Sequence, residues 1–206
     1  TGVQTCAPSD LATSTTAPPG WPPRTSACAR TTSAASARFG NYRGRFDDAL
    51  ARIETLYKPY HRALRRLFTK VHREFGSAML VDCHSMPSST GPRDERPRAD
   101  VVLGDRYGTS CVAVVSEVVE TTLRARGYAV SRNKPYAGGF ITEHYGNPAA
   151  GLHAIQIEFN RGLYMDERRF ERAEGFGRVA ADLEILAERL ADIPLEELRP
   201  YRAAAE

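Results

Sequence analysis

The sequence predicts an α/β fold with a mostly parallel sheet. Residues 79–86 and 153–161 read as strands that end on polar side chains. Residues 46–75 and 167–193 carry apolar residues at alternating steps of three and four, which predicts two amphipathic helices. The apolar run at the start of residues 79–86 suits a strand that is buried on both faces, as in a parallel sheet.

Length, charge and cysteine content limit the class of protein. The 206 residues suffice for one domain with a substantial core. The net charge of +3 is mild and the arginines are spread along helices, so we expect no nucleic-acid partner. No apolar run approaches the roughly 20 residues that span a bilayer, and no signal peptide is visible, so we expect no membrane partner. The four cysteines form no CxxC pair, which predicts a reduced, cytoplasmic protein.

Residues 1–38 are dominated by Thr, Ser, Ala and Pro and show no periodicity. Such a segment cannot bury enough apolar surface to offset the entropy of ordering. We therefore expect a disordered or aberrant leader, followed by one domain over residues 39–206. Since the chain begins without Met, our hypothesis is that it is a fragment or that its first segment is read out of frame. An intact upstream reading frame with its own start codon would contradict this hypothesis.

The first predicted helix covers residues 46–75. Pro59 lacks an amide donor, so the helix is expected to kink or restart there, and Gly76 is expected to end it. The strand over residues 79–86 follows, and a long polar loop at residues 86–98 then has the length of a functional flap.

The polar end of the first strand is the first candidate site. It contains Asp82, Cys83, His84 and Ser85. In open α/β sheets, ligands sit just beyond the carboxyl ends of the strands. His84 is therefore a candidate metal ligand or acid/base group. The alternative is that Asp82 and His84 merely hydrogen-bond each other.

The middle of the chain predicts further strands at residues 99–104 and 128–132, with a helix over residues 112–123 between them. A loop at residues 133–140 follows. Its Gly138-Gly139 pair either lets backbone approach a ligand closely or simply makes a turn.

The strand over residues 153–161 supplies the second candidate site. A period of two places Ala154, Gln156, Glu158 and Asn160 on one face, opposite the apolar face. An acidic residue late in a buried strand costs free energy unless it is paired or used. Glu158 is thus a candidate general base, with a buried salt bridge to Arg161 or another arginine as the alternative.

Three chemistries stay open on the residues alone. The first is a zinc hydrolase in which His84 binds the metal, Asp82 or a neighbour orients the imidazole and Glu158 takes a proton from metal-bound water. The second is a thiolate nucleophile at Cys83 or Cys111, although Cys83 faces away from His84 in a regular strand. The third is a non-enzymatic domain in which the histidine and the glutamate are structural.

Four ordered motifs resemble the N-formylglutamate amidohydrolase family. They are DCHSM at residues 82–86, DVVLGDRYGTSC at 100–111, NKPYAGGFIT at 133–142 and GLHAIQIEFNRGLYM at 151–165. The segment YKPYH at residues 57–61 fits as well. The resemblance covers roughly residues 46–193, and several motifs in order are far more specific than any single one.

The resemblance implies a three-layer α/β/α fold with a mostly parallel mixed sheet, similar to the zinc carboxypeptidases. It implies hydrolysis of N-formyl-L-glutamate to formate and L-glutamate, as in one route of histidine degradation, with one Zn²⁺ that activates water. His84 matches the strand end that supplies a zinc ligand, and Glu158 matches the catalytic glutamate. The dicarboxylate product needs cationic or polar partners, for which the candidates by loop position are Arg106, Arg132, Lys134, Tyr136 and Arg161.

The chain departs from the family pattern near its N-terminus. The early His-Ser-Gly and Asp-Leu-Asn-Arg segments of the family do not occur, and no histidine precedes His61. A catalytic zinc normally takes three protein ligands; His84 is one, and Asp82 and His144 are unassigned neighbours. We therefore expect the domain to be N-terminally incomplete. A related zinc deacylase or aminoacylase and an inactive remnant of the fold are the alternatives, and oligomeric state stays open.

Overall fold

The computed structural model describes residues 46–88 and 99–200. The chain divides into two compact units, and within the described residues the boundary falls between Arg66 and Leu67. The boundary that we expected near residue 38 and most of the loop at 86–98 lie outside the described residues.

The helix predicted over residues 46–75 is present but interrupted. It consists of α3 (Phe46–Arg52), a π-helical turn (Ile53–Tyr57) and α4 (Lys58–Phe75). Pro59 is the second residue of α4, and the helix continues through it from the π-helical turn, because Arg52 and Lys58 on either side of that turn are both helical. The expected kink or restart at Pro59 is therefore replaced by a change of helix type just before the proline. Gly76 has a positive φ of 75° and ends α4, as predicted.

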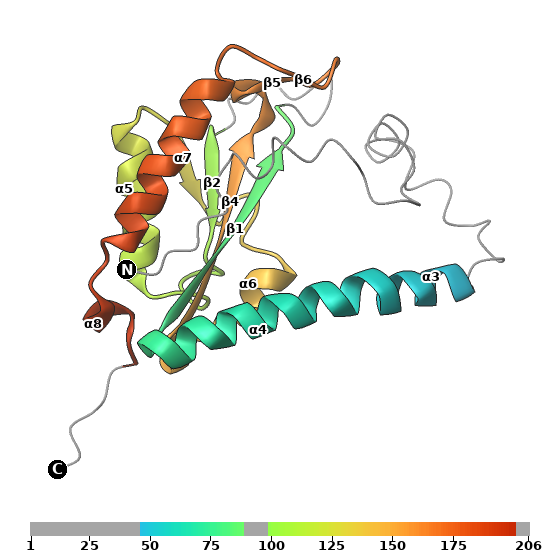
Figure 1. Cartoon of the computed structure of the whole chain (residues 1–206). Coiled ribbons are helices and arrows are strands. Elements are labelled where there is room, and N and C mark those ends of the chain that lie inside the picture. The colour runs from blue at the N-terminus through green and yellow to red at the C-terminus, as the bar shows by residue number, and fades with distance from the viewer. Residues whose placement is uncertain (1–45, 89–98, 201–206) are drawn as a thin grey trace. The chain divides into compact units, whose positions relative to one another are not determined.

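Four strands form one mixed sheet in the order β1-β4-β2-β3 (Figure 1). Their bounds are β1 Ala78–Met86, β2 Val101–Gly104, β3 Val130–Arg132 and β4 Leu152–Asn160. β1 runs parallel to β4, and β3 runs parallel to β2, whereas β2 and β4 are antiparallel. The predicted α/β fold with a mostly parallel sheet is therefore confirmed.

One face of the sheet carries the main hydrophobic core. α5 (Ala113–Ala125) and α7 (Phe176–Ala191) lie on this face (Figure 1). Ile155, Ile157 and Phe159 of β4 are buried in the same cluster as the apolar side chains of both helices. The predicted alternation of β4 is confirmed, and it turns Gln156 and Glu158 to the opposite face, where α6 (Phe140–Tyr145) packs on the strand.

The burial predicted for β1 is only partly correct. Among the described strands β1 pairs with β4 alone and lies at the edge of the sheet. Ala78 and Met86 are buried, but Cys83 and His84 are exposed. The residues from Met79 to Asp82 are only half-buried, so the expectation of a strand buried on both faces is wrong for the apolar run as well as for these two residues. The exposure leaves the His84 imidazole accessible to solvent.

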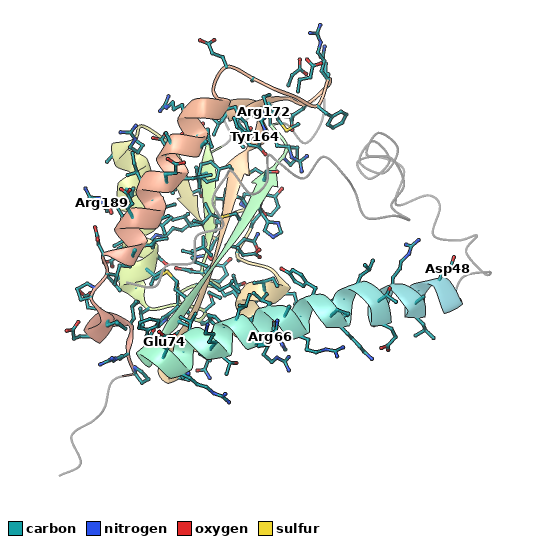
Figure 2. All side chains as sticks on the ribbon, viewed as in Figure 1. Asp48, Arg66, Glu74, Tyr164, Arg172 and Arg189 are labelled. Carbon is teal, nitrogen blue, oxygen red and sulfur yellow. The ribbon has the colours of Figure 1, made fainter. Side chains whose placement is uncertain are left out.

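The last helix begins later than predicted. Residues expected in its first turns form a short hairpin, β5 (Met165–Asp166) with β6 (Glu171–Arg172), and α7 begins at Phe176. The Asp166 carboxylate accepts hydrogen bonds from the Arg168 and Arg169 amides and stabilises the turn. Tyr164 and Arg172 lie together near the start of α7 (Figure 2), where the Arg172 guanidinium is 4.3 Å from the centre of the Phe176 ring.

A buried ionic cluster joins α5 to α7. The fully buried Asp182 carboxylate accepts hydrogen bonds from Arg126 Nε at 2.5 Å and the Tyr128 hydroxyl at 2.6 Å, and Arg178 Nε lies 3.6 Å away. Burial alone would raise the pKa of Asp182, but the hydrogen bonds from Tyr128 and Arg126 and the two guanidinium charges outweigh it and lower the pKa. Burial and the hydrogen bond to Asp182 raise the pKa of Tyr128 to about 12.

Three short helical segments complete the described part: a 3-10 turn at Pro148–Ala150, another at Arg161–Leu163, and α8 at Leu195–Leu198. No helix in this part of the chain has the length and apolar character needed to cross a membrane.

Candidate functional site

The structure brings the two main candidate residues together. β1 and β4 pair in parallel with His84 opposite Glu158 and Asp82 opposite Gln156. Because side chains alternate along a strand, all four lie on the same face of the sheet. His84 Nε2 lies 3.2 Å from Asp82 Oδ2, and His84 Nδ1 lies 3.8 Å from Glu158 Oε1. The imidazole is 49% exposed and the Glu158 side chain only 10%, so a buried carboxylate meets an accessible imidazole.

Glu158 is held by an amide rather than by an arginine. Gln156 Nε2 donates to Glu158 Oε1 at 2.7 Å. Arg161, the salt-bridge partner considered from the sequence, instead donates from Nε and Nη2 to Ser85 Oγ and Ser85 O, at 3.1 and 3.2 Å. Arg161 therefore ties the carboxyl end of β1 to the end of β4, and the position of Glu158 remains compatible with a general base.

The Gly138-Gly139 pair lets the loop that carries it pack closely against the sheet, rather than against a bound ligand. A Cβ atom at Gly104 would lie 2.5 Å from the Gly138 amide nitrogen, and Gly138 has a positive φ of 109°. The Gly139 amide donates to Gln156 Oε1 at 2.8 Å. The loop after β3 thus rests on the sheet over Gly104 and reaches the polar face of β4.

A buried network holds the two loops that follow β2 and β3. Asp105 accepts from Asn133 Nδ2 at 2.7 Å, from Ser116 Oγ at 2.8 Å and from the Gly108 amide at 3.0 Å. Burial alone would raise the pKa of Asp105, but these hydrogen bonds and the Arg132 charge outweigh it and lower the pKa. Sequence reasoning missed Asp105 and Asn133, although both directly follow a predicted strand and that position was the available signal.

The candidate substrate-binding residues differ in their partners. Arg106 has a positive φ of 52° and places Nη2 3.5 Å from Glu143 Oε1. Arg132 Nε instead donates to Glu120 of α5 at 2.5 Å. Lys134 is exposed, and within the described residues it forms no ion pair. Tyr136 is half-buried. Substrate contact by these residues stays a prediction.

His153 and the cysteines Cys83 and Cys111 do not add to the site. His153 is fully buried, and its Nε2 donates to the Leu198 carbonyl at 2.8 Å, so it is a structural histidine whose pKa burial lowers. The His144 ring stacks on Phe140 with ring centres 4.9 Å apart. Burial raises the pKa of the Cys111 thiol to about 11, and Cys83 lies on the face away from His84, so a thiolate nucleophile is disfavoured.

The donor set around His84 does not by itself fit a catalytic zinc ion. Such a site normally needs three protein ligands. Across residues 46–88 and 99–200, no group of three His, Cys, Asp or Glu side chains is arranged to hold a metal ion. Asp82 Oδ2 lies 3.2 Å from His84 Nε2, and a role of Asp82 in orienting the imidazole stays a prediction.

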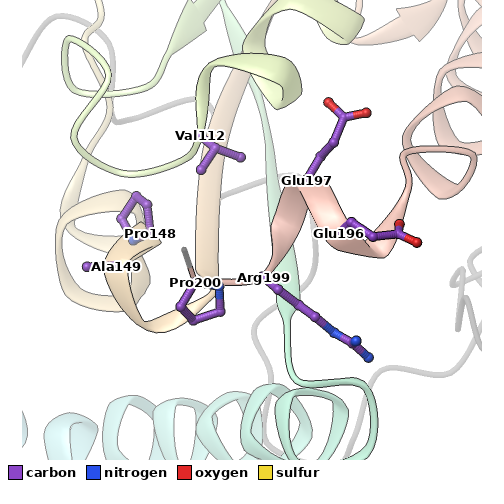
Figure 3. A pocket seen from close by; sticks show the side chains of 7 residues that line it. All are labelled: Val112, Pro148, Ala149, Glu196, Glu197, Arg199 and Pro200. Atoms are coloured by element: carbon purple, nitrogen blue, oxygen red, sulfur yellow. The ribbon is translucent and has the colours of Figure 1, made fainter. Parts of the chain in front are cut away.

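A surface depression lies at the other end of β4, near its amino end (Figure 3). Its lining residues are Val112, Pro148, Ala149, Glu196, Glu197, Arg199 and Pro200. The Arg199 guanidinium donates to the Phe75 carbonyl, at 3.3 Å from Nε and 3.1 Å from Nη2. The depression contains neither His84 nor Glu158 and is not part of the candidate site.

The chain is similar in sequence to one protein family and to curated members of it. The sequence pattern of the N-formylglutamate amidohydrolase family matches residues 14–165. An N-formylglutamate deformylase of Pseudomonas putida is 37% identical over 116 residues, which are 56% of this chain and 43% of that protein. One of Pseudomonas aeruginosa is 32% identical over 123 residues, 59% of this chain and 46% of that protein. The chain thus spans less than half the length of these curated relatives.

Two solved structures are similar to this chain in fold. The crystal structure of N-formylglutamate amidohydrolase from Ralstonia eutropha JMP134 is similar with a TM-score of 0.67 and 40% identity, over 71% of this chain and 54% of that one. A gene product of Agrobacterium tumefaciens is similar with a TM-score of 0.53 and 18% identity, over 75% of this chain and 58% of that one, which supports the fold alone.

Proposed function

Because the chain belongs to the N-formylglutamate amidohydrolase family, we propose that it hydrolyses the formyl amide of N-formyl-L-glutamate to formate and L-glutamate. The observation that carries this proposal is the pairing of His84 with Glu158 on adjacent parallel strands, with Nδ1 and Oε1 3.8 Å apart. The deformylases of the two Pseudomonas species match the chain in sequence, which supports the substrate class. A place in histidine degradation and in the cytoplasm is consistent with this reaction and belongs to the same proposal.

Glu158 is the proposed general base. Its carboxylate is largely buried and is held by one amide, so it is oriented yet keeps capacity to accept a proton. In the reaction, Glu158 takes a proton from water as the water oxygen bonds to the formyl carbon. When the C–N bond breaks, the same proton passes to the leaving amine, and the carboxylate is restored.

The proposed reaction depends on zinc, with His84 as one ligand. His84 offers an accessible imidazole whose orientation Asp82 fixes, which suits one ligand of a metal ion. Since the described residues offer no three-donor group, the other ligands of such an ion would come from outside them. Elemental analysis of the purified, desalted chain for zinc tests this part directly.

Arg106 is the best-placed candidate for binding a substrate carboxylate. Its distance of 3.5 Å to Glu143 is long for an ion pair with strong hydrogen bonds, and both side chains are solvent-accessible. A Cβ atom at Gly138 would lie 3.2 Å from Arg106 Cγ, so Arg106 packs against the loop that reaches Gln156. In contrast, Arg132 and Arg161 already donate to Glu120 and Ser85.

The test compares release of formate from N-formyl-L-glutamate with release of acetate from N-acetyl-L-aspartate, both with and without added zinc. Preferential hydrolysis of N-formyl-L-glutamate is the expected result. Preference for N-acetyl-L-aspartate would instead support a related deacylase. Absence of turnover on both substrates would support a non-catalytic protein, which the lack of a three-donor group among the described residues favours as the second candidate.

A further inference from the structure

We propose that Gln156 is a positioning residue that fixes the orientation of the Glu158 carboxylate and ties it to the Gly138-Gly139 loop. The inference rests on the proposed function, in which Glu158 is the general base. It concerns the geometry of this chain alone and needs no metal ion.

Gln156 forms a two-ended bridge. Its side chain is buried, with 6% exposed, and lies two residues before Glu158 on the same face of β4. Nε2 donates to Glu158 Oε1 at 2.7 Å, and Oε1 accepts from the Gly139 amide at 2.8 Å. A backbone amide can only donate and a carboxylate can only accept, so both bonds require the same orientation of the glutamine amide.

The bridge determines which carboxylate oxygen is used. A free glutamate carboxylate rotates broadly about its last torsion angle. Here the Gln156 amide and His84 Nδ1 both lie next to Oε1 of Glu158, at 2.7 and 3.8 Å. Since a charge-assisted hydrogen bond holds Oε1, the second oxygen, Oε2, is the one that takes the proton from water.

Three glycines allow the loop to reach Gln156. Gly104 lies directly opposite Gln156 in the β2 and β4 pairing, and a Cβ atom there would lie 2.5 Å from the Gly138 amide nitrogen. A Cβ atom at Gly139 would lie 3.3 Å from Gln156 Oε1. The loop and the carboxylate are therefore linked through one side chain, and loss of the Gly139 bond frees the glutamine that orients Glu158.

Two substitutions separate the two ends of the bridge. Gln156→Leu removes both hydrogen bonds at similar volume. Gln156→Glu keeps an acceptor for the Gly139 amide but removes the donor to Glu158. Ile157→Val is the matched control, because it trims a neighbouring side chain of β4 on the opposite, core face.

The first readout is hydrogen exchange of the Gly139 amide in the full chain. We expect exchange to rise about tenfold in Gln156→Leu, as for loss of one hydrogen bond, and to stay within about twofold of wild type in Gln156→Glu and Ile157→Val. The Gly146 amide, which donates to the Thr142 carbonyl, is the internal reference. Unchanged exchange of the Gly139 amide in a folded Gln156→Leu protein would refute the proposed hydrogen bond between Gly139 and Gln156.

The second readout is the orientation of the Glu158 carboxylate together with the turnover that it supports. Crystal structures of both Gln156 variants are expected to show it in a different or mixed orientation, with kcat for N-formyl-L-glutamate lowered at least about tenfold and KM changed less than about threefold. A Glu158 carboxylate that keeps its orientation, or a full kcat, would overturn the proposal. If wild type shows no hydrolysis, the proposed function fails, while amide exchange and carboxylate orientation still decide this inference.

Discussion

The Tyr128→Phe substitution probes the buried cluster that joins α5 to α7. It removes only the hydroxyl that donates to the buried Asp182 carboxylate at 2.6 Å. The ring contact of Tyr128 with Phe159, at 6.0 Å between ring centres, and the position of Arg178 over the ring at 5.2 Å do not depend on the hydroxyl. Because Phe159 is the neighbour of Glu158 in β4, this cluster also supports the strand that carries the proposed base.

A hydrogen bond to a charged group contributes about 1.5–3 kcal/mol. Asp182 keeps Arg126 as a partner, but that arginine is 45% exposed and its contribution is screened by solvent. We therefore expect Tyr128→Phe to lower the free energy of unfolding by about 2 kcal/mol at pH 7.

The pH dependence has a definite sign. The pKa of Tyr128 is raised to about 12 in the folded protein, and an unfolded tyrosine titrates near pH 10. The stability that the hydroxyl contributes is thus fully present below about pH 10 and lost as pH rises toward 12. The difference between wild type and Tyr128→Phe should shrink over that range, and the roughly two pH units correspond to about 2.7 kcal/mol.

Urea denaturation followed by circular dichroism at pH 7, 9, 10 and 11 measures this difference. Tyr107→Phe is the matched control, since Tyr107 is 70% exposed and its hydroxyl should contribute nothing measurable. A Tyr128→Phe protein within about 0.5 kcal/mol of wild type at pH 7, or a difference that does not change with pH, would refute the reasoning.

Three further predictions concern the site. Arg106→Ala should raise KM for N-formyl-L-glutamate about tenfold and change kcat less than about threefold, because one carboxylate contact is lost; steady-state kinetics decide, and a loss mainly in kcat would contradict it. Gly104→Ala should lower the free energy of unfolding by at least about 2 kcal/mol, because its Cβ atom would meet the loop backbone. Gly177→Ala, where a Cβ atom meets nothing within 4 Å, is the control, and equal stability of the two in urea would refute the packing argument. His84→Ala should abolish zinc in elemental analysis while leaving stability within about 1 kcal/mol, since the imidazole is half exposed; zinc retained by this variant would rule out His84 as a ligand.

Local patterns in the sequence predicted the four strands of the main sheet and the helices α4 and α5. The alternation at residues 153–161 predicts both faces of β4, because a strand has a fixed period of two. The start of α7 was not predictable in the same way. The hairpin of β5 and β6 depends on the Asp166 turn and on packing around Phe176, and neither shows in a helical periodicity.

The sequence predicted the individual residues of the candidate site but not their contacts. His84 and Glu158 each follow from the polar end of an apolar strand, but their contact depends on the pairing register of β1 with β4, which the sequence does not state. The partners of Arg132 and Arg161 depend on α5 and on the end of β1, so loop position alone did not separate them from Arg106. Gln156 has no signal beyond its place on the Glu158 face.

The most direct measurement is hydrolysis of N-formyl-L-glutamate by wild type and by Glu158→Gln, each supplied with zinc and each checked for folding by circular dichroism. The account predicts turnover by wild type and a kcat lowered at least about a hundredfold in Glu158→Gln, as for loss of a general base. Equal turnover by the two proteins would contradict the assignment of Glu158.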